Sequence, residues 1–184
     1  MKKIVLWLAL IGFATLIIVA CSSSSDENPT STSSASLPDY ATTTLSGKIG
    51  VDWTFQTGRM VVPSSSSGSY WYYMTNDNLS NACSSTYTGT SSNPKVTYSR
   101  DAAPEAGEHE FSFTSGNVKT VTFYDGTTNY IITKGKITID TVTTTAVTGK
   151  MYAISGSDTD HEINGTFTLS RCCTSGSSYA LCSE

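Results

Sequence analysis

Positive charge and histidine are both scarce in this 184-residue chain. It has 11 Lys and Arg residues against 15 Asp and Glu residues, only 14% of its residues are charged, and it has 2 histidines. No cluster of Lys and Arg occurs anywhere after the first three residues. Affinity for phosphate backbones and for anionic lipid headgroups depends on clustered cations. The composition therefore argues against binding to nucleic acids, and against peripheral binding to an anionic membrane surface.

Recognisable catalytic and metal-binding motifs are also missing. The sequence has no Gly-x-Ser-x-Gly and no Cys-x-x-Cys spacing, so neither a serine-hydrolase elbow nor a zinc site is indicated. Ser92 and Lys95 match a Ser-x-x-Lys motif only formally, because Pro94 disfavours the helix that this motif requires. The alternating acids Asp158, Asp160 and Glu162 match a calcium loop incompletely, and we interpret them as a solvated turn. We predict no catalytic residue, no metal and no cofactor.

The one long apolar run lies at the N-terminus. Lys2 and Lys3 precede an apolar stretch from Ile4 to Ala20, which is the layout of an export signal. The stretch ends in Ile-Val-Ala followed by Cys21, and this ending resembles the lipobox of bacterial lipoproteins. The resemblance implies that residues 1–20 are a signal peptide. It also implies that Cys21 carries a diacylglycerol and a further acyl chain, such as palmitate, that anchors the protein to a membrane.

The residue after the lipidation site bears on the destination of the protein. In bacterial lipoproteins an aspartate at this position is the usual signal for retention in the inner membrane, and here the residue is Ser22. The resemblance therefore implies the outer membrane, with the domain facing the periplasm or the outside. Two or three acyl chains would hold it there, since each buried methylene contributes about 0.8 kcal/mol.

The composition changes after Cys21 and again near residue 45. Residues 22–44 are rich in Ser, Thr and Pro and nearly free of large apolar side chains, so they cannot bury enough surface to offset their conformational entropy. We predict that residues 21–44 are a lipidated flexible tether. Residues 45–184 are then a single domain that is large enough to bury a core.

Helical periodicity is absent from the whole chain after Cys21, whereas alternation is common. Strict alternation from Leu45 to Gln56 predicts a half-buried strand, and Asp125-Gly126 predicts a hairpin turn. The pattern predicts an all-β domain of about eight or nine strands. We expect an antiparallel β-sandwich, and a closed lipocalin-like β-barrel is the alternative.

Three short patterns follow one another in the second half of the chain. They are GKITI at residues 135–139, VTGKMYA at 147–153 and NGTF at 164–167. This succession resembles a group of small lipoproteins of Gram-negative bacteria. The resemblance implies a β-fold and a location in the cell envelope, and it implies no activity.

Four cysteines remain besides Cys21, and in an exported chain they predict two disulfides. They are Cys83, Cys172, Cys173 and Cys182. A bond between the two adjacent cysteines would be strained, which leaves two pairings. Adjacent residues of a strand point to opposite faces, so Cys173 should share the core face of Phe167 and Leu169, and Cys172 should face outward. On this basis we favour Cys83–Cys173 with Cys172–Cys182.

The most unusual local feature is an aromatic run in the expected strand at residues 69–75. The run comprises Tyr70, Trp71, Tyr72 and Tyr73. Its first and third residues share one face of the strand, and its second and fourth share the other. One pair must belong to the core. The other is a candidate ligand surface for a sugar ring or a partner protein of the envelope, with hydroxyls supplied by the Ser-rich loops 64–69 and 84–92.

These observations together favour an anchored envelope lipoprotein with a non-enzymatic binding or structural β-domain. An envelope-acting hydrolase or enzyme inhibitor is the alternative. Its support is limited to His109 and His161, each of which stands between two acidic residues. A catalytic role would require the two histidines to meet in space.

Overall fold

The computed structural model describes residues 36–84, 91–111, 120–156, 158–175 and 178–183. The chain divides into two units, Met1–Ser36 and Leu37–Glu184, and every strand described below belongs to the second unit. The predicted signal peptide and the predicted lipid site at Cys21 lie outside the described residues. In the described part of the chain, no helix has the length and hydropathy that a membrane span requires.

The described residues form twelve strands, which confirms the all-β prediction. The strands are β1 (Ser46–Ile49), β2 (Val51–Thr54), β3 (Thr57–Val62), β4 (Tyr70–Thr75), β5 (Lys95–Arg100), β6 (Gly107–Glu110), β7 (Val121–Tyr124), β8 (Asn129–Ile132), β9 (Lys134–Val142), β10 (Ala146–Ser155), β11 (Asp158–Ser175) and β12 (Ser178–Leu181).

The number of strands exceeds the prediction because some expected strands divide. The alternating stretch from Leu45 to Gln56 folds back on itself at Gly50, so that Ile49 of β1 pairs with Val51 of β2. Gly50 has φ +72°, a left-handed backbone conformation that glycine adopts without steric cost. Ile49, Trp53 and Phe55 are buried on the two sides of the turn, whereas Val51, which shares their parity, is 56% exposed.

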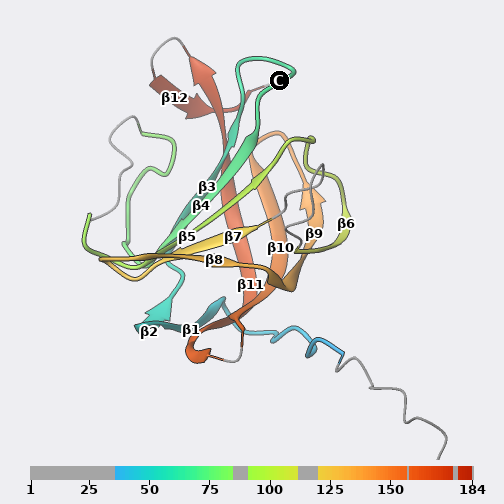
Figure 1. Ribbon diagram of the computed structural model, residues 1–184. Coiled ribbons are helices and arrows are strands. Elements are labelled where there is room, and N and C mark those ends of the chain that lie inside the picture. The colour runs from blue at the N-terminus through green and yellow to red at the C-terminus, as the bar shows by residue number, and fades with distance from the viewer. Residues whose placement is uncertain (1–35, 85–90, 112–119, 157, 176–177, 184) are drawn as a thin grey trace, which may run out of the picture. The chain divides into compact units, whose positions relative to one another are not determined.

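All twelve strands belong to one mixed sheet, whose main order is β6-β9-β10-β11-β3-β4-β5-β7-β8 (Figure 1). Strands β1 and β12 pair with β11 outside this path, and β2 pairs with β1. Every ladder is antiparallel except the one between β11 and β3, where Cys172 lies beside Val61. The predicted sandwich is not confirmed, since hydrogen bonds connect all the strands in a single curled sheet.

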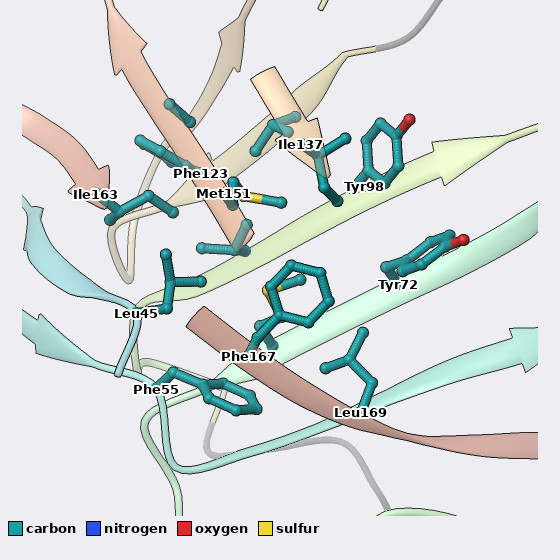
Figure 2. Close-up of a cluster of buried hydrophobic side chains, with 14 of the residues drawn as sticks. Leu45, Phe55, Tyr72, Tyr98, Phe123, Ile137, Met151, Ile163, Phe167 and Leu169 are labelled. Atoms are coloured by element: carbon teal, nitrogen blue, oxygen red, sulfur yellow. The ribbon is translucent and has the colours of Figure 1, made fainter. Parts of the chain in front are cut away.

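The core occupies the concave side of this sheet. Figure 2 shows side chains from several strands converging there, among them Leu45, Phe123 and Phe167, all of which are buried. The largest fully buried side chains include Trp53, Tyr72, Tyr98, Phe123, Ile137 and Met151. Full burial of such a side chain contributes roughly 1.5–3 kcal/mol. The hydrophobic effect therefore explains why the sheet closes over this face.

Hydrogen bonds also join residues that precede β1 to strand β11. Asn164 of β11 accepts a hydrogen bond from the Ala41 amide (2.9 Å) and donates one to the Asp39 carbonyl (3.1 Å). Two further bonds of 2.8 Å join the backbone of Thr166 to Thr43 and Leu45. Hydrogen bonds therefore attach residues between Asp39 and Leu45 to β11.

Gly165 allows this segment to approach β11 closely. Its φ is +145°, and a Cβ atom there would lie 2.6 Å from the Cα atom of Leu45. Gly107 provides a matched control, because its φ is +140° but a Cβ atom there would meet nothing within 4 Å. We expect Gly165→Ala to lower the free energy of unfolding by about 1–3 kcal/mol more than Gly107→Ala, owing to overpacking. Urea denaturation measures both, and equal effects would contradict the proposed contact.

Candidate functional site

Strand β4 distributes its aromatic run between the two faces of the sheet. Tyr72 is completely buried in the core, and Tyr70 packs against the core from the same face. Trp71 points to the outer face, where 41% of its surface is exposed, and Tyr73 on that face is half-buried. Of the four candidate residues, Tyr70 and Tyr72 therefore line the interior, and Trp71 and Tyr73 are the pair on the outer face.

The two outer rings form a flat aromatic platform. The ring centroids of Trp71 and Tyr73 are 6.2 Å apart, and the ring planes differ by 16°. This separation is close to the rise of two residues along a strand, about 6.5–7 Å. Two nearly parallel rings at this spacing can offer a continuous apolar surface to a planar or ring-shaped ligand.

Arg59 supports the platform from the neighbouring strand. It pairs with Tyr73 across β3 and β4, and its guanidinium carbon lies 5.5 Å from the Tyr73 ring centroid. On its other side the same carbon lies 4.7 Å from the ring of Tyr179 in β12. Burial raises the pKa of Tyr73, and the positive charge of Arg59 opposes this shift. Arg59 thus joins two aromatic rings through cation–π contacts, a role that sequence reasoning missed.

Hydroxyl groups lie beside the platform on strand β5. Ser99 is opposite Trp71 and Thr97 is opposite Tyr73, and Thr122 of β7 continues the second row. All three residues are half-buried. The predicted source of hydroxyls was the loops 64–69 and 84–92, of which residues 85–90 lie outside the described residues. The sheet itself provides hydroxyls at a position that the sequence did not reveal.

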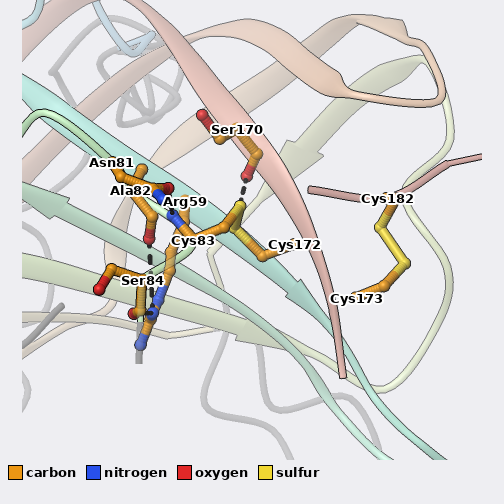
Figure 3. The surroundings of a disulfide bond; sticks show 9 residues. All are labelled: Arg59, Asn81, Ala82, Cys83, Ser84, Ser170, Cys172, Cys173 and Cys182. Carbon is orange, nitrogen blue, oxygen red and sulfur yellow. Dashed lines mark hydrogen bonds between the residues drawn. A yellow bond between two sulfur atoms is a disulfide. The ribbon is translucent and has the colours of Figure 1, made fainter. Parts of the chain in front are cut away.

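The loop after β4 is fastened to the outer face of the sheet. Arg59 donates hydrogen bonds from Nη1 to the carbonyls of Ala82 (3.4 Å) and Ser84 (3.1 Å). Between these two residues, Cys83 forms a disulfide with Cys172 of β11, with a Cα–Cα distance of 5.4 Å (Figure 3). Arg59 and the disulfide hold the same short segment, and as a result the guanidinium is buried although it lies on the outer face.

The second disulfide joins Cys173 to Cys182 and ties β12 to β11, with a Cα–Cα distance of 5.0 Å. Two disulfides are therefore present, but the favoured pairing of Cys83 with Cys173 is wrong. The predicted directions of the side chains remain consistent with the register, because Cys172 lies beside Val61 and Val61 lies opposite the exposed Trp71.

The pairing was predicted wrongly because the sequence did not indicate which face of the sheet the loop of Cys83 covers. We expected this loop to reach the core face, whereas it covers the outer face, where Cys172 points. The hairpin register decides the remaining bond: Cys173 is opposite Ala180. Cys182 follows Ala180 by two residues, directly after β12, and its amide still donates to the Arg171 carbonyl. It therefore points to the same face as Cys173, since side chains alternate along extended backbone.

The two histidines have separate environments. His109 of β6 has its Nε2 atom 3.0 Å from Nη1 of Arg100. His161 of β11 is buried, with its Nδ1 atom 3.0 Å from a carboxylate oxygen of Asp158 and its ring against Tyr130. The hydrogen bond from His161 lowers the pKa of Asp158. Strands β9 and β10 lie between β6 and β11 in the sheet, so the structure does not bring these histidines into one site.

Comparison with known proteins gives no relative. No protein-family model, no curated protein and no solved structure matches this chain. Among the described residues, no group of three or more His, Cys, Asp or Glu side chains is arranged to hold a metal ion. The aromatic platform and its supports are accordingly the candidate site that the geometry defines.

The disulfide pairing can be tested with two double variants. In the lipidated protein, Cys83→Ser/Cys172→Ser keeps the bond between Cys173 and Cys182, so we expect no free thiol. In Cys83→Ser/Cys173→Ser the two remaining cysteines point to opposite faces, and we expect two free thiols. Titration with a thiol reagent under denaturing conditions counts them. The reverse result would restore the alternative pairing.

The same bonds should differ in their effect on stability. The chain-entropy model gives about 4–5 kcal/mol for a loop of the size closed by Cys83–Cys172 and about 2.5–3 kcal/mol for the short loop closed by Cys173–Cys182. The first of these bonds spans 89 residues and the second 9.

Proposed function

We propose that this chain is a lipid-anchored envelope protein whose β-domain binds glycans through the platform of Trp71 and Tyr73. The stacking of these two rings and the exposure of Trp71 carry the proposal. Sugar rings present apolar C–H faces that pack on aromatic rings, while their hydroxyls require polar partners nearby. The hydroxyls of Thr97 and Ser99, opposite the two rings, suit this requirement.

Rigidity of the platform supports a role in binding. The Tyr73 ring is held by Arg59, and Arg59 is in turn held by backbone carbonyls on both sides of Cys83. A surface that is already ordered before binding loses less conformational entropy when the ligand arrives. The covalent bond to Cys172 and the cation–π contacts would therefore increase affinity without contacting the ligand.

We infer for the architecture that the curled sheet is a partly closed barrel, the alternative to the sandwich. Tyr98 of β5 and Phe111, the residue after β6, approach to 5.8 Å between ring centroids. In the order of strands along the sheet, β5 and β6 lie far apart, on opposite sides of β3. Strand β8, near one end of this order, also contacts β10, near the other end. Contacts between the two halves favour closure of one sheet around one core.

Trp71→Ala should separate binding from stability. Trp71 is 41% exposed, so we expect the free energy of unfolding to fall by less than about 1 kcal/mol, whereas Tyr72→Ala should cost about 3–5 kcal/mol. Affinity for a pyranose oligosaccharide identified on a glycan array should fall at least tenfold in isothermal titration calorimetry. Ile131→Ala, which removes another exposed apolar side chain, is the control and should bind normally. Unchanged affinity of Trp71→Ala would disprove the glycan platform.

The membrane anchor is tested independently of the ligand. Metabolic labelling with an alkyne-bearing fatty acid should mark the wild-type protein and Ser22→Ala, and should fail to mark Cys21→Ala, since the Cys21 thiol is the proposed attachment point. Cell fractionation should then find Cys21→Ala outside the membrane fraction. Equal labelling of Cys21→Ala and the wild type would exclude lipidation at this residue.

A further inference from the structure

A polar cluster lies inside the curled sheet, at one end of the core. Tyr72 and Tyr98 are directly opposite each other on β4 and β5, with ring centroids 5.2 Å apart, and neither has any exposed surface. Their hydroxyl oxygens have no hydrogen-bond partner. In Figure 2 both hydroxyls point away from Leu45 and Ile163, toward the same end of the cluster. A buried hydroxyl without a partner is costly, so two together call for an explanation.

Arg100 adds a positive charge to this cluster. It follows Tyr98 by two residues and therefore shares its face of β5, and it is opposite Tyr70. Only 7% of Arg100 is exposed, and its Nε atom is buried without a hydrogen-bond partner. Within the described residues, no carboxylate forms an ion pair with it. Buried charges are normally paired, so the guanidinium lacks the anion that its position requires.

His109 contacts Arg100 without neutralising it. A guanidinium can only donate hydrogen bonds, so Nε2 of His109 must accept in their 3.0 Å contact. In this contact the imidazole is consequently neutral, with its proton on Nδ1. One unit of positive charge therefore remains in the cluster.

The two phenols are suited to act as donors beside this charge. Burial raises the pKa of Tyr98 to about 12, and Arg100 opposes that shift. Burial also raises the pKa of Tyr72. Both hydroxyls thus keep their protons at neutral pH and can donate to an anion.

We propose that Tyr72, Tyr98 and Arg100 form a binding site for the carboxylate of a small molecule that carries an apolar group. The two oxygens of a carboxylate can accept hydrogen bonds from both hydroxyls and from the guanidinium Nε–H. Phe111, whose ring lies 5.8 Å from that of Tyr98, offers an apolar contact for the rest of the ligand. Tyr70 and His109 are half-buried, so they are the neighbours of this cluster that reach the surface.

Charge balance favours a carboxylate over phosphate as the ligand group. The single guanidinium compensates a monoanion, whereas a phosphate dianion would leave one negative charge buried without a partner. A neutral amide would leave the guanidinium uncompensated. This site is independent of the proposed glycan platform, because Trp71 and Tyr73 point to the opposite face of β4.

Deletion of each tyrosine hydroxyl tests the site. Hexanoate is the probe for isothermal titration calorimetry and thermal unfolding of the wild-type protein, with hexanamide and inorganic phosphate as comparison ligands. Tyr72→Phe and Tyr98→Phe should each weaken hexanoate binding about tenfold or more, since each removes a hydrogen bond to a charged group. Arg100→Gln should weaken it further. Tyr73→Phe, the same change on the outer face of β4, should leave it unchanged.

Stability of the free protein distinguishes a binding role from a structural one. Because neither hydroxyl has a partner, Tyr72→Phe and Tyr98→Phe should keep or raise the melting temperature without ligand, while reducing the increase that hexanoate produces. A lower melting temperature in both variants would show that the hydroxyls are bonded within the protein, and would overturn the site. Equal binding of hexanoate and hexanamide by the wild type, or tighter binding of phosphate, would also overturn it.

Discussion

The pairing of β11 with its neighbours is the interaction on which the rest of the structure depends. This strand of 18 residues pairs with β10 and β12 and also with β1 and β3. Its parallel ladder with β3 connects the N-terminal hairpins to the C-terminal strands, whereas all other ladders are antiparallel. Residues 39–45 also bind along β11. Without this strand, neither the outer platform nor the interior cluster would have a fixed framework.

The two faces of β3, β4 and β5 carry two different arrangements of aromatic rings with an arginine. On the outer face, buried Arg59 donates hydrogen bonds to two carbonyls and contacts two aromatic rings. On the inner face, Arg100 lies near two tyrosine hydroxyls that have no partner, and its contact is with His109. The outer arrangement supports the platform. The inner arrangement differs in its two buried tyrosine hydroxyls, which have no hydrogen-bond partner beside the guanidinium.

The cysteines illustrate the limit of reasoning from alternation. The pattern of β11 correctly placed Cys172 on the outer face and Cys173 on the other, because side-chain direction is a local property of a strand. It did not identify which face the loop of Cys83 covers. That depends on where the loop packs in three dimensions, and the outer face of β3 offered Arg59 as a partner for its carbonyls.

Local rules thus determined the all-β class, the two faces of the aromatic strand and the hairpin turn at Asp125-Gly126, since each depends on residues close together in the chain. The curling of a single sheet, the partners of Cys172 and Cys173, and the positions of Arg59 and Arg100 were decided only by the tertiary structure. Pairing between strands that are far apart in the chain depends on which apolar faces pack together and on which backbone groups still need hydrogen-bond partners. Alternation along one strand contains no information about which strand lies beside it.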